Sequence, residues 1–148
     1  MSAQKEIKEI ANAKPNSSLH HFAEHQIRPR LLLIEDDKAL RRFLQVTLDQ
    51  AGYDVIPAAD GLEGMKMALA AKIDVVVTDA MMPHLSGHEF CRFLRNSEGL
   101  SHIPIIILSG SEPQQGLTKK ELADAFLAKP VTAAELTDCL ERLLRAAK

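Results

Sequence analysis

Hydrophobic and polar positions along the chain fall into two alternating patterns. Short apolar runs occupy residues 31–34, 53–57, 75–78, 103–108 and 125–128, and continuous runs of this length suit strands that are buried on both faces of a sheet. Between the runs, apolar residues return every three or four positions, as on the buried side of an amphipathic helix. The pattern therefore predicts five strands that alternate with helices.

Capping signals set the expected limits of the helices. A helix over residues 38–51 should end before Gly52, since glycine favours the left-handed conformation that follows a helix. Three further helices should start at a capping pair, namely Asp60–Glu63, Ser86–Glu89 and Thr132–Glu135. A weaker helix, interrupted by Gly116, is expected between residues 113 and 123. The apolar residues that indicate the first, second and last helices are Leu40, Phe43, Leu44, Val46, Leu48 and Ala51, then Leu62, Met65, Ala68 and Leu69, then Leu136, Cys139, Leu140, Leu143 and Leu144.

Short connections between these units predict one α/β domain over residues 30–148. Right-handed crossovers give a doubly wound parallel sheet of five strands with helices on both faces. Residues 1–29 differ in composition and are expected to form a flexible or partly helical N-terminal extension. Its apolar residues suggest that it folds onto the domain or onto a second copy; they are Ile7, Ile10, Leu19, Phe22 and Ile27.

Composition excludes several classes of function. A net charge of −2, no tryptophan and one tyrosine argue against nucleic-acid binding. Cys91 and Cys139 lack the spacing of a zinc site, and two isolated cysteines indicate neither a disulfide nor a zinc ion. No apolar run is long enough for a signal peptide or a bilayer span. We therefore expect a cytoplasmic protein without membrane insertion.

Polar side chains follow four of the five predicted strands. Glu35 and Asp36 follow the first strand, Asp79 the third, Ser109 the fourth and Lys129 the fifth. These positions meet at the carboxyl edge of a parallel sheet, where open α/β folds place their sites.

Clustered carboxylates repel one another and call for a cation, and oxygen ligands match Mg²⁺ better than zinc. Lys129 and the Ser109 hydroxyl suit a phosphoryl group, for which Asp79 can be the nucleophile. Asp37 is explained equally well as a ligand and as the cap of the next helix.

Four motifs together resemble bacterial response-regulator receiver domains. They are residues 31–37 (LLLIEDD), 79–87 (DAMMPHLSG), 105–110 (IIILSG) and 126–130 (FLAKP). The resemblance covers roughly residues 30–147. It implies the strand order 2-1-3-4-5 of flavodoxin-like folds.

The resemblance also implies a role for each residue of the site. Asp79 would be the phosphoacceptor, and the donor would be a histidine kinase or a histidine phosphotransfer protein. Mg²⁺ would be held by Glu35, Asp36, Asp79 and the backbone carbonyl of Met81. Lys129 would contact the phosphoryl group, while Ser109 and Phe126 would form the switch.

A receiver of this kind would signal by protein contacts. The fourth helix, fifth strand and last helix would present the output surface. The protein would not be an enzyme beyond its own phosphorylation and slow autodephosphorylation. We expect a stand-alone receiver, with a fragment of a larger hybrid kinase or transcription regulator as the alternative.

Three positions depart from the commonest receiver pattern. Glu35 stands where aspartate is usual, Gly110 where alanine is usual, and Met81 offers no polar side chain near the acceptor. A phosphohydrolase of the haloacid-dehalogenase type also uses an aspartate, Mg²⁺ and a lysine, but it typically needs a second aspartate where Met81 stands. The receiver is therefore favoured.

Overall fold

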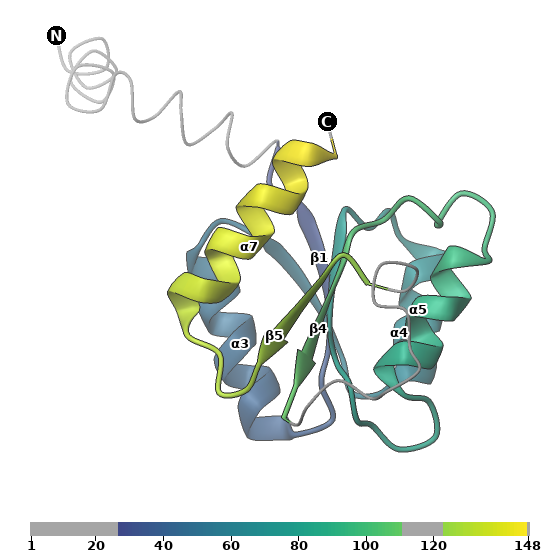
Figure 1. Ribbon diagram of the computed structural model, residues 1–148, viewed down its shortest axis with the longest axis horizontal. Coiled ribbons are helices and arrows are strands. Elements are labelled where there is room, and N and C mark those ends of the chain that lie inside the picture. The colour runs from purple at the N-terminus through teal and green to yellow at the C-terminus, as the bar shows by residue number, and fades with distance from the viewer. Residues whose placement is uncertain (1–26, 111–122, 148) are drawn as a thin grey trace, which may run out of the picture.

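A computed structural model describes residues 27–110 and 123–147, and it has the expected architecture. The elements in chain order are β1 (Arg30–Ile34), α3 (Lys38–Gln50), β2 (Asp54–Ala58), α4 (Gly61–Ala70), β3 (Val75–Asp79), α5 (Gly87–Arg95), β4 (Ile105–Ser109), β5 (Ala125–Ala128) and α7 (Ala133–Ala146). The five strands are all parallel and lie in the order β2-β1-β3-β4-β5 (Figure 1). The predicted α/β fold and the predicted strand order are both confirmed. The helix expected between residues 113 and 123 lies almost entirely outside the described residues.

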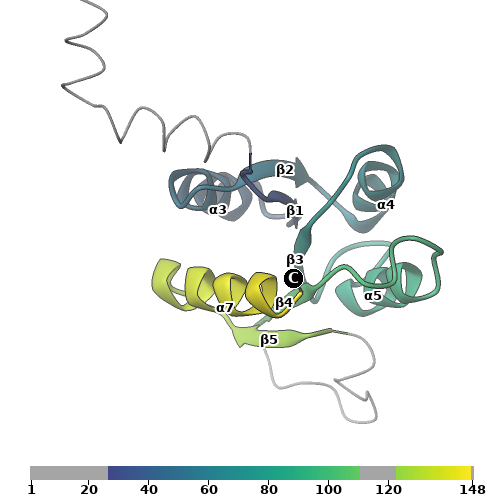
Figure 2. The ribbon, with the colours of Figure 1, turned by 90° about the horizontal axis from the view of Figure 1, so that it is seen from above.

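The sheet separates two apolar cores. Figure 2 shows α3 and α7 on one face and α4 and α5 on the other. Successive strand residues point to opposite faces, so Leu31 and Leu33 pack toward α3 and α7 while Leu32 and Ile34 pack toward α4 and α5. Both faces are covered, which explains why the central strands are continuous apolar runs.

Two of the three predicted capping pairs form completely, and the third forms only in part. The helix end expected before Gly52 is also found. Ser86 and Thr132 each form a complete capping box with the glutamate three residues later. Asp60 accepts the backbone N–H of Glu63, but the Glu63 carboxylate accepts from Ala59 instead of Asp60. Asp37 caps α3, and Gly52 follows that helix with a φ of 105°.

Several details of the sequence prediction are wrong. The second strand covers 54–58 in place of 53–57, and the fourth covers 105–109 in place of 103–108. Four of the large apolar residues on the predicted helices are exposed, namely Phe43 (56%), Val46 (39%), Leu62 (51%) and Leu69 (69%). A helix lying on a sheet buries only one stripe, so apolar residues beside that stripe remain in solvent.

The remaining expectations concern the cysteines, the membrane and the extension. Cys91 and Cys139 are free, buried, and located in the two different cores. None of the described helices is long and apolar enough to cross a membrane. Residues 1–26 lie outside the described residues, so the division at residue 30 stays a prediction.

Candidate functional site

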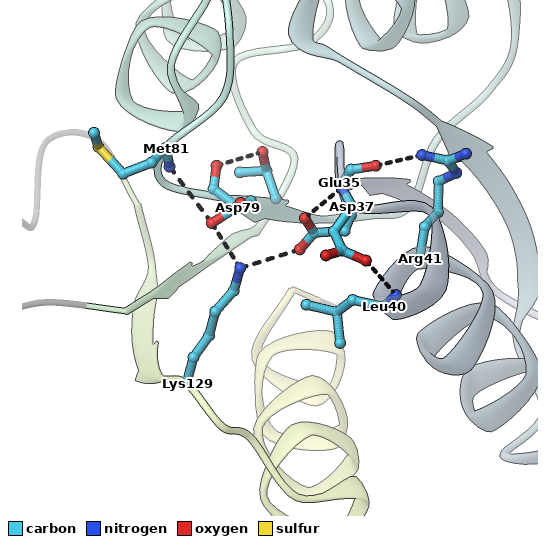
Figure 3. A network of polar contacts seen from close by, with 8 residues as sticks. Glu35, Asp37, Leu40, Arg41, Asp79, Met81 and Lys129 are labelled. Carbon is cyan, nitrogen blue, oxygen red and sulfur yellow. Dashed lines mark hydrogen bonds and ion pairs between the residues drawn. The ribbon is translucent and has the colours of Figure 1, made fainter.

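The predicted site residues converge at the carboxyl edge of the sheet. Asp79 is the last residue of β3 and Ser109 the last of β4. Glu35 follows β1 directly, and Lys129 follows β5 directly. The neighbouring order β1-β3-β4-β5 therefore places all four residues along one edge (Figure 3 shows three of them).

Lys129 bridges two buried carboxylates. Its Nζ lies 3.2 Å from Glu35 Oε1 and 3.0 Å from Asp79 Oδ1 (Figure 3). The Glu35 side chain is 1% exposed and that of Asp79 is 8% exposed. Burial of two carboxylates this close together is unfavourable without a nearby positive charge, and Lys129 supplies that charge.

A third carboxylate completes a cluster that fits a metal ion. One ligand oxygen each from Glu35, Asp36 and Asp79 lies within 4.8 Å of the others, and Asp36 is exposed. Three hard oxygen donors without histidine or cysteine are typical of Mg²⁺ and not of zinc. Asp37 is not part of this cluster. Its Oδ1 accepts the Leu40 backbone N–H at 2.9 Å and caps α3.

Glu35 is held on both sides by the start of α3. Its Oε2 accepts the backbone N–H of Asp37 at 3.0 Å, and its carbonyl oxygen accepts from Arg41 Nη1 at 2.8 Å. Sequence reasoning missed Arg41, which lies in the first turn of α3, shortly after the acidic run. The fixed backbone explains how a glutamate can stand at this position with its carboxylate directed into the cluster.

The electrostatics of the site follow from this burial. Burial raises the pKa of Glu35 above its ordinary value of 4.5 and the Asp79 carboxylate raises it further, against the opposing effects of the Asp37 N–H and Lys129. Burial alone would lower the pKa of Lys129, but its hydrogen bond to Asp79 and the charge of Glu35 raise that pKa above 10.5. Without a metal, the cluster therefore favours a protonated lysine and resists a fully charged Glu35.

The raised pKa of Glu35 predicts a pH-dependent effect of its removal. The folded state binds this proton more tightly than the unfolded chain, so this group makes stability fall as pH rises above 4.5. We expect Glu35→Gln to raise the unfolding free energy of metal-free protein by on the order of 1 kcal/mol near pH 8 and to change it little near pH 4. Urea unfolding in a chelator measures the difference.

The exposed Glu98 provides a matched control, because Glu98→Gln should change stability little at either pH. Added Mg²⁺ should reduce the advantage of Glu35→Gln, because the variant has lost one ligand. Equal stability of Glu35→Gln and wild type near pH 8 would contradict the conclusion that burial and the Asp79 charge make a charged Glu35 unfavourable.

The loop after β3 is packed directly against the start of α5. The Gly87 backbone N–H donates to the Ala80 carbonyl at 3.0 Å. A Cβ atom added at Gly87 would clash with the Asp79 carbonyl oxygen. Met81 donates its backbone N–H to Asp79 Oδ1 at 3.4 Å, and its side chain is 64% exposed. Only glycine at position 87 therefore allows this loop geometry.

Gly87→Ala is expected to lower the unfolding free energy by roughly 1–3 kcal/mol and to displace the Asp79 backbone. The reason is that the new methyl group meets backbone atoms, which cannot move aside as a flexible side chain would. Gly110→Ala is the matched control, since a Cβ there meets nothing within 4 Å. Urea unfolding of the two variants checks the result, and equal losses would contradict it.

Phe126 lies on the strand next to Ser109, with its ring against α5. Its ring and that of His88 are stacked with centroids 6.1 Å apart and an interplanar angle of 29°. Ser109 accepts the backbone N–H of Lys129 at its carbonyl oxygen, 2.8 Å away. Sequence reasoning missed His88, whose partner is distant along the chain. Burial and the charge of Arg92 lower the pKa of His88, so the neutral imidazole is the favoured stacking partner.

Comparison with known proteins identifies the family. The model of the response regulator receiver domain matches residues 31–141. The DNA-binding dual master transcriptional regulator RpaA of Synechocystis sp. is 34% identical over 121 residues, which are 79% of this chain and 49% of RpaA. The chain belongs to the response-regulator receiver family of two-component systems.

Solved structures agree with this assignment. The chemotaxis response regulator CheY4 of Vibrio cholerae matches with a TM-score of 0.73 and 30% identity, over 78% of this chain and 98% of CheY4. Response regulator TrrA of Thermotoga maritima, in complex with Mg²⁺–BeF, matches with a TM-score of 0.71 and 26% identity over 78% of this chain and 98% of TrrA. The chain spans about half the length of the curated relatives it matches.

Receiver domains are signalling modules and not true enzymes. The family assignment therefore favours signalling over the phosphohydrolase alternative.

Proposed function

We propose that this receiver accepts a phosphoryl group on Asp79 and signals the change by protein contacts. The observation that carries the proposal is the buried carboxylate of Asp79 at the end of the central strand β3, which contacts Lys129 and lies in a cluster with Glu35 and Asp36. This combination supplies a nucleophile, a cation for the transferred group and a place for a metal ion.

The reaction is a direct transfer between two side chains. One carboxylate oxygen of Asp79 attacks the phosphorus of a donor, such as the phosphohistidine of a kinase or phosphotransfer protein. The new P–O bond forms as the P–N bond of the donor breaks, and the imidazole leaves with the electron pair of that bond. Lys129 stays protonated throughout and stabilises the negative charge that reaches the phosphoryl oxygens.

Mg²⁺ fits the acidic cluster and is the metal ion we propose. Glu35, Asp36 and Asp79 would hold it, together with the backbone carbonyl of Met81. When bound, it would supply charge neutralisation for the phosphoryl oxygens. The TrrA complex with Mg²⁺–BeF supports this proposal because TrrA has the same fold.

Ser109 and Phe126 are proposed to pass the phosphorylation state to the protein surface. Ser109 ends the strand beside Asp79, and Phe126 lies on the next strand with its ring against His88. The two residues could therefore report a change at Asp79 to the face that includes β5 and α7. We propose that a downstream protein binds there, and that the receiver acts in the cytoplasm without binding nucleic acid itself.

A labelling experiment tests the proposed chemistry. Purified protein incubated with Mg²⁺ and a small phosphodonor such as acetyl phosphate should gain 80 Da, in a form stable to acid and labile to base. A chelator should remove the effect. Absence of the adduct under conditions that label a known receiver would overturn the proposal.

The lengths of the relatives suggest a second form of output, a DNA-binding domain in the same chain. RpaA is described as a DNA-binding transcriptional regulator, and this chain corresponds to about half of it. A larger regulator with its own output domain is thus the alternative to a stand-alone receiver. An immunoblot of cells that produce the protein distinguishes them, since a stand-alone receiver should migrate near 16.3 kDa.

A further inference from the structure

An apolar groove lies at the edge of the sheet opposite to the proposed phosphorylation site. Its volume is about 710 Å³, and its wall includes Ile27, Pro29, Ile73, Leu100, Ile103 and Leu144. These residues come from the start of β1, the connections into β3 and β4, and the last turn of α7. Figure 1 shows the end of α7 and the start of β1 at the same edge of the domain. The groove is comparable in size to a ligand pocket of ordinary dimensions.

We propose that the N-terminal segment of this same chain, residues 19–26, occupies this groove. The first argument is position. The segment leads directly into Ile27, which lines the groove and whose side chain is 73% exposed. A segment tethered at the groove itself has an effective concentration on the order of millimolar, so weak apolar contacts are enough to hold it.

The second argument is the direction in which the chain enters β1. Arg28 Nη2 contacts the Asp49 carboxylate at 3.1 Å and donates to the Tyr53 carbonyl at 2.7 Å. Two residues on, the Arg30 backbone N–H donates to Asp74 Oδ2 at 2.8 Å, and Asp74 also lines the groove. These contacts fix the chain on both sides of Pro29, so the segment before Ile27 starts at the mouth of the groove.

The third argument is the sequence of the segment. Apolar residues follow Leu19 at three, four and eight positions, namely Phe22, Ala23 and Ile27. This spacing predicts one apolar stripe on a helix. Lys72 and His102 lie among the groove residues, and Glu24 is the single acidic residue between positions 10 and 34. An apolar stripe with one carboxylate thus matches an apolar groove that carries Lys72 and His102, while Asp74 of the groove already accepts the Arg30 backbone N–H.

A spin label provides the test in the full chain. The variant Ser18→Cys carries a nitroxide, and the native thiols should not compete because both are buried and the pKa of Cys91 is raised to about 12. We expect the amide signals of residues 71–74 and 99–103 to lose at least half of their intensity by paramagnetic relaxation. Amides of residues 84–89, which follow β3 at the opposite edge, should keep theirs.

Two double variants and one single variant separate docking from mere proximity. The double variant Leu19→Asp, Phe22→Asp should restore the intensity of the groove amides. The double variant His21→Asp, His25→Asp should leave their loss of intensity unchanged. Ala147→Arg adds a bulky side chain at the exposed end of α7, where a positive charge suits the helix terminus, and should weaken the effect. Effects that persist unchanged in the Leu19 and Phe22 variant would overturn the proposal.

A mixing experiment distinguishes this chain from a second copy. Spin-labelled protein without ¹⁵N is mixed with ¹⁵N-labelled protein that carries no spin label. The proposal expects full intensity in the ¹⁵N-labelled groove amides. Relaxation there would show that the segment binds a partner molecule and would overturn the intramolecular assignment. Failure of either test leaves the phosphoryl chemistry of Asp79 untouched, because the groove lies at the other edge of the sheet.

Discussion

Asp79→Asn is expected to lower phosphate incorporation from a small phosphodonor by at least about 100-fold, because the amide oxygen is a far weaker nucleophile than the carboxylate. The variant should fold normally, since asparagine keeps the shape of the buried side chain and reduces the repulsion with Glu35. Mass spectrometry of the intact protein in Mg²⁺ measures the incorporation directly.

Asp138→Asn is the matched control for this experiment. Asp138 lies exposed on α7, away from the acidic cluster, so its variant should label as wild type does. If Asp79→Asn labelled equally well, another residue would be the phosphoacceptor, and peptide mapping of the adduct would locate it.

Lys129→Met is expected to destabilise the protein and to lower phosphorylation at the same time. It removes a cation that contacts both Glu35 and Asp79, whose side chains are 1% and 8% exposed. A loss of roughly 1–3 kcal/mol near pH 8 follows from leaving this carboxylate pair without a counter-charge. In wild type, the titration of Lys129 itself removes its contribution only as pH rises through its raised folded pKa, above 10.5.

Two conditions should reduce the stability loss of Lys129→Met. Lower pH should help, since protonation of Glu35 removes one of the two facing charges. Mg²⁺ should also help, because a bound cation replaces the missing positive charge. Urea unfolding near pH 5 and pH 8, with and without Mg²⁺, checks both effects.

Lys66→Met provides the comparison for Lys129→Met, since Lys66 is exposed on α4. The Lys66 variant should lose little stability and should label normally. Equal stability of Lys129→Met and wild type at both pH values would show that Lys129 does not neutralise the buried pair. A label on Lys129→Met at the wild-type level would show that the lysine is not needed for transfer.

Sequence patterns were sufficient for the strands and most helices because their signals are local, whereas the strand order came from the resemblance to receiver domains. Each strand is a short apolar run, and most helices begin at a capping pair a few residues long. The errors are equally local in origin. Phe43 and Leu44 are neighbours of similar hydrophobicity, yet only Leu44 faces the sheet, and the spacing of apolar residues alone does not decide which stripe is buried.

The sequence by itself determined which side chains reach the site. Glu35, Asp79, Ser109 and Lys129 each end or follow a strand, and parallel strands deliver such residues to one edge. The sequence did not determine how these residues divide their roles. Asp37 was explained equally well as a ligand and as a helix cap, and only the position of the Leu40 N–H shows that it caps α3.

The tertiary structure decided the contacts between distant parts of the chain. Lys129 and Glu35 are 94 residues apart in the sequence and 3.2 Å apart in space. The approach of Gly87 to the Asp79 carbonyl and the stacking of Phe126 on His88 are of the same kind. Such contacts depend on how neighbouring strands and helices pack, and no local pattern of hydrophobic and polar residues specifies them.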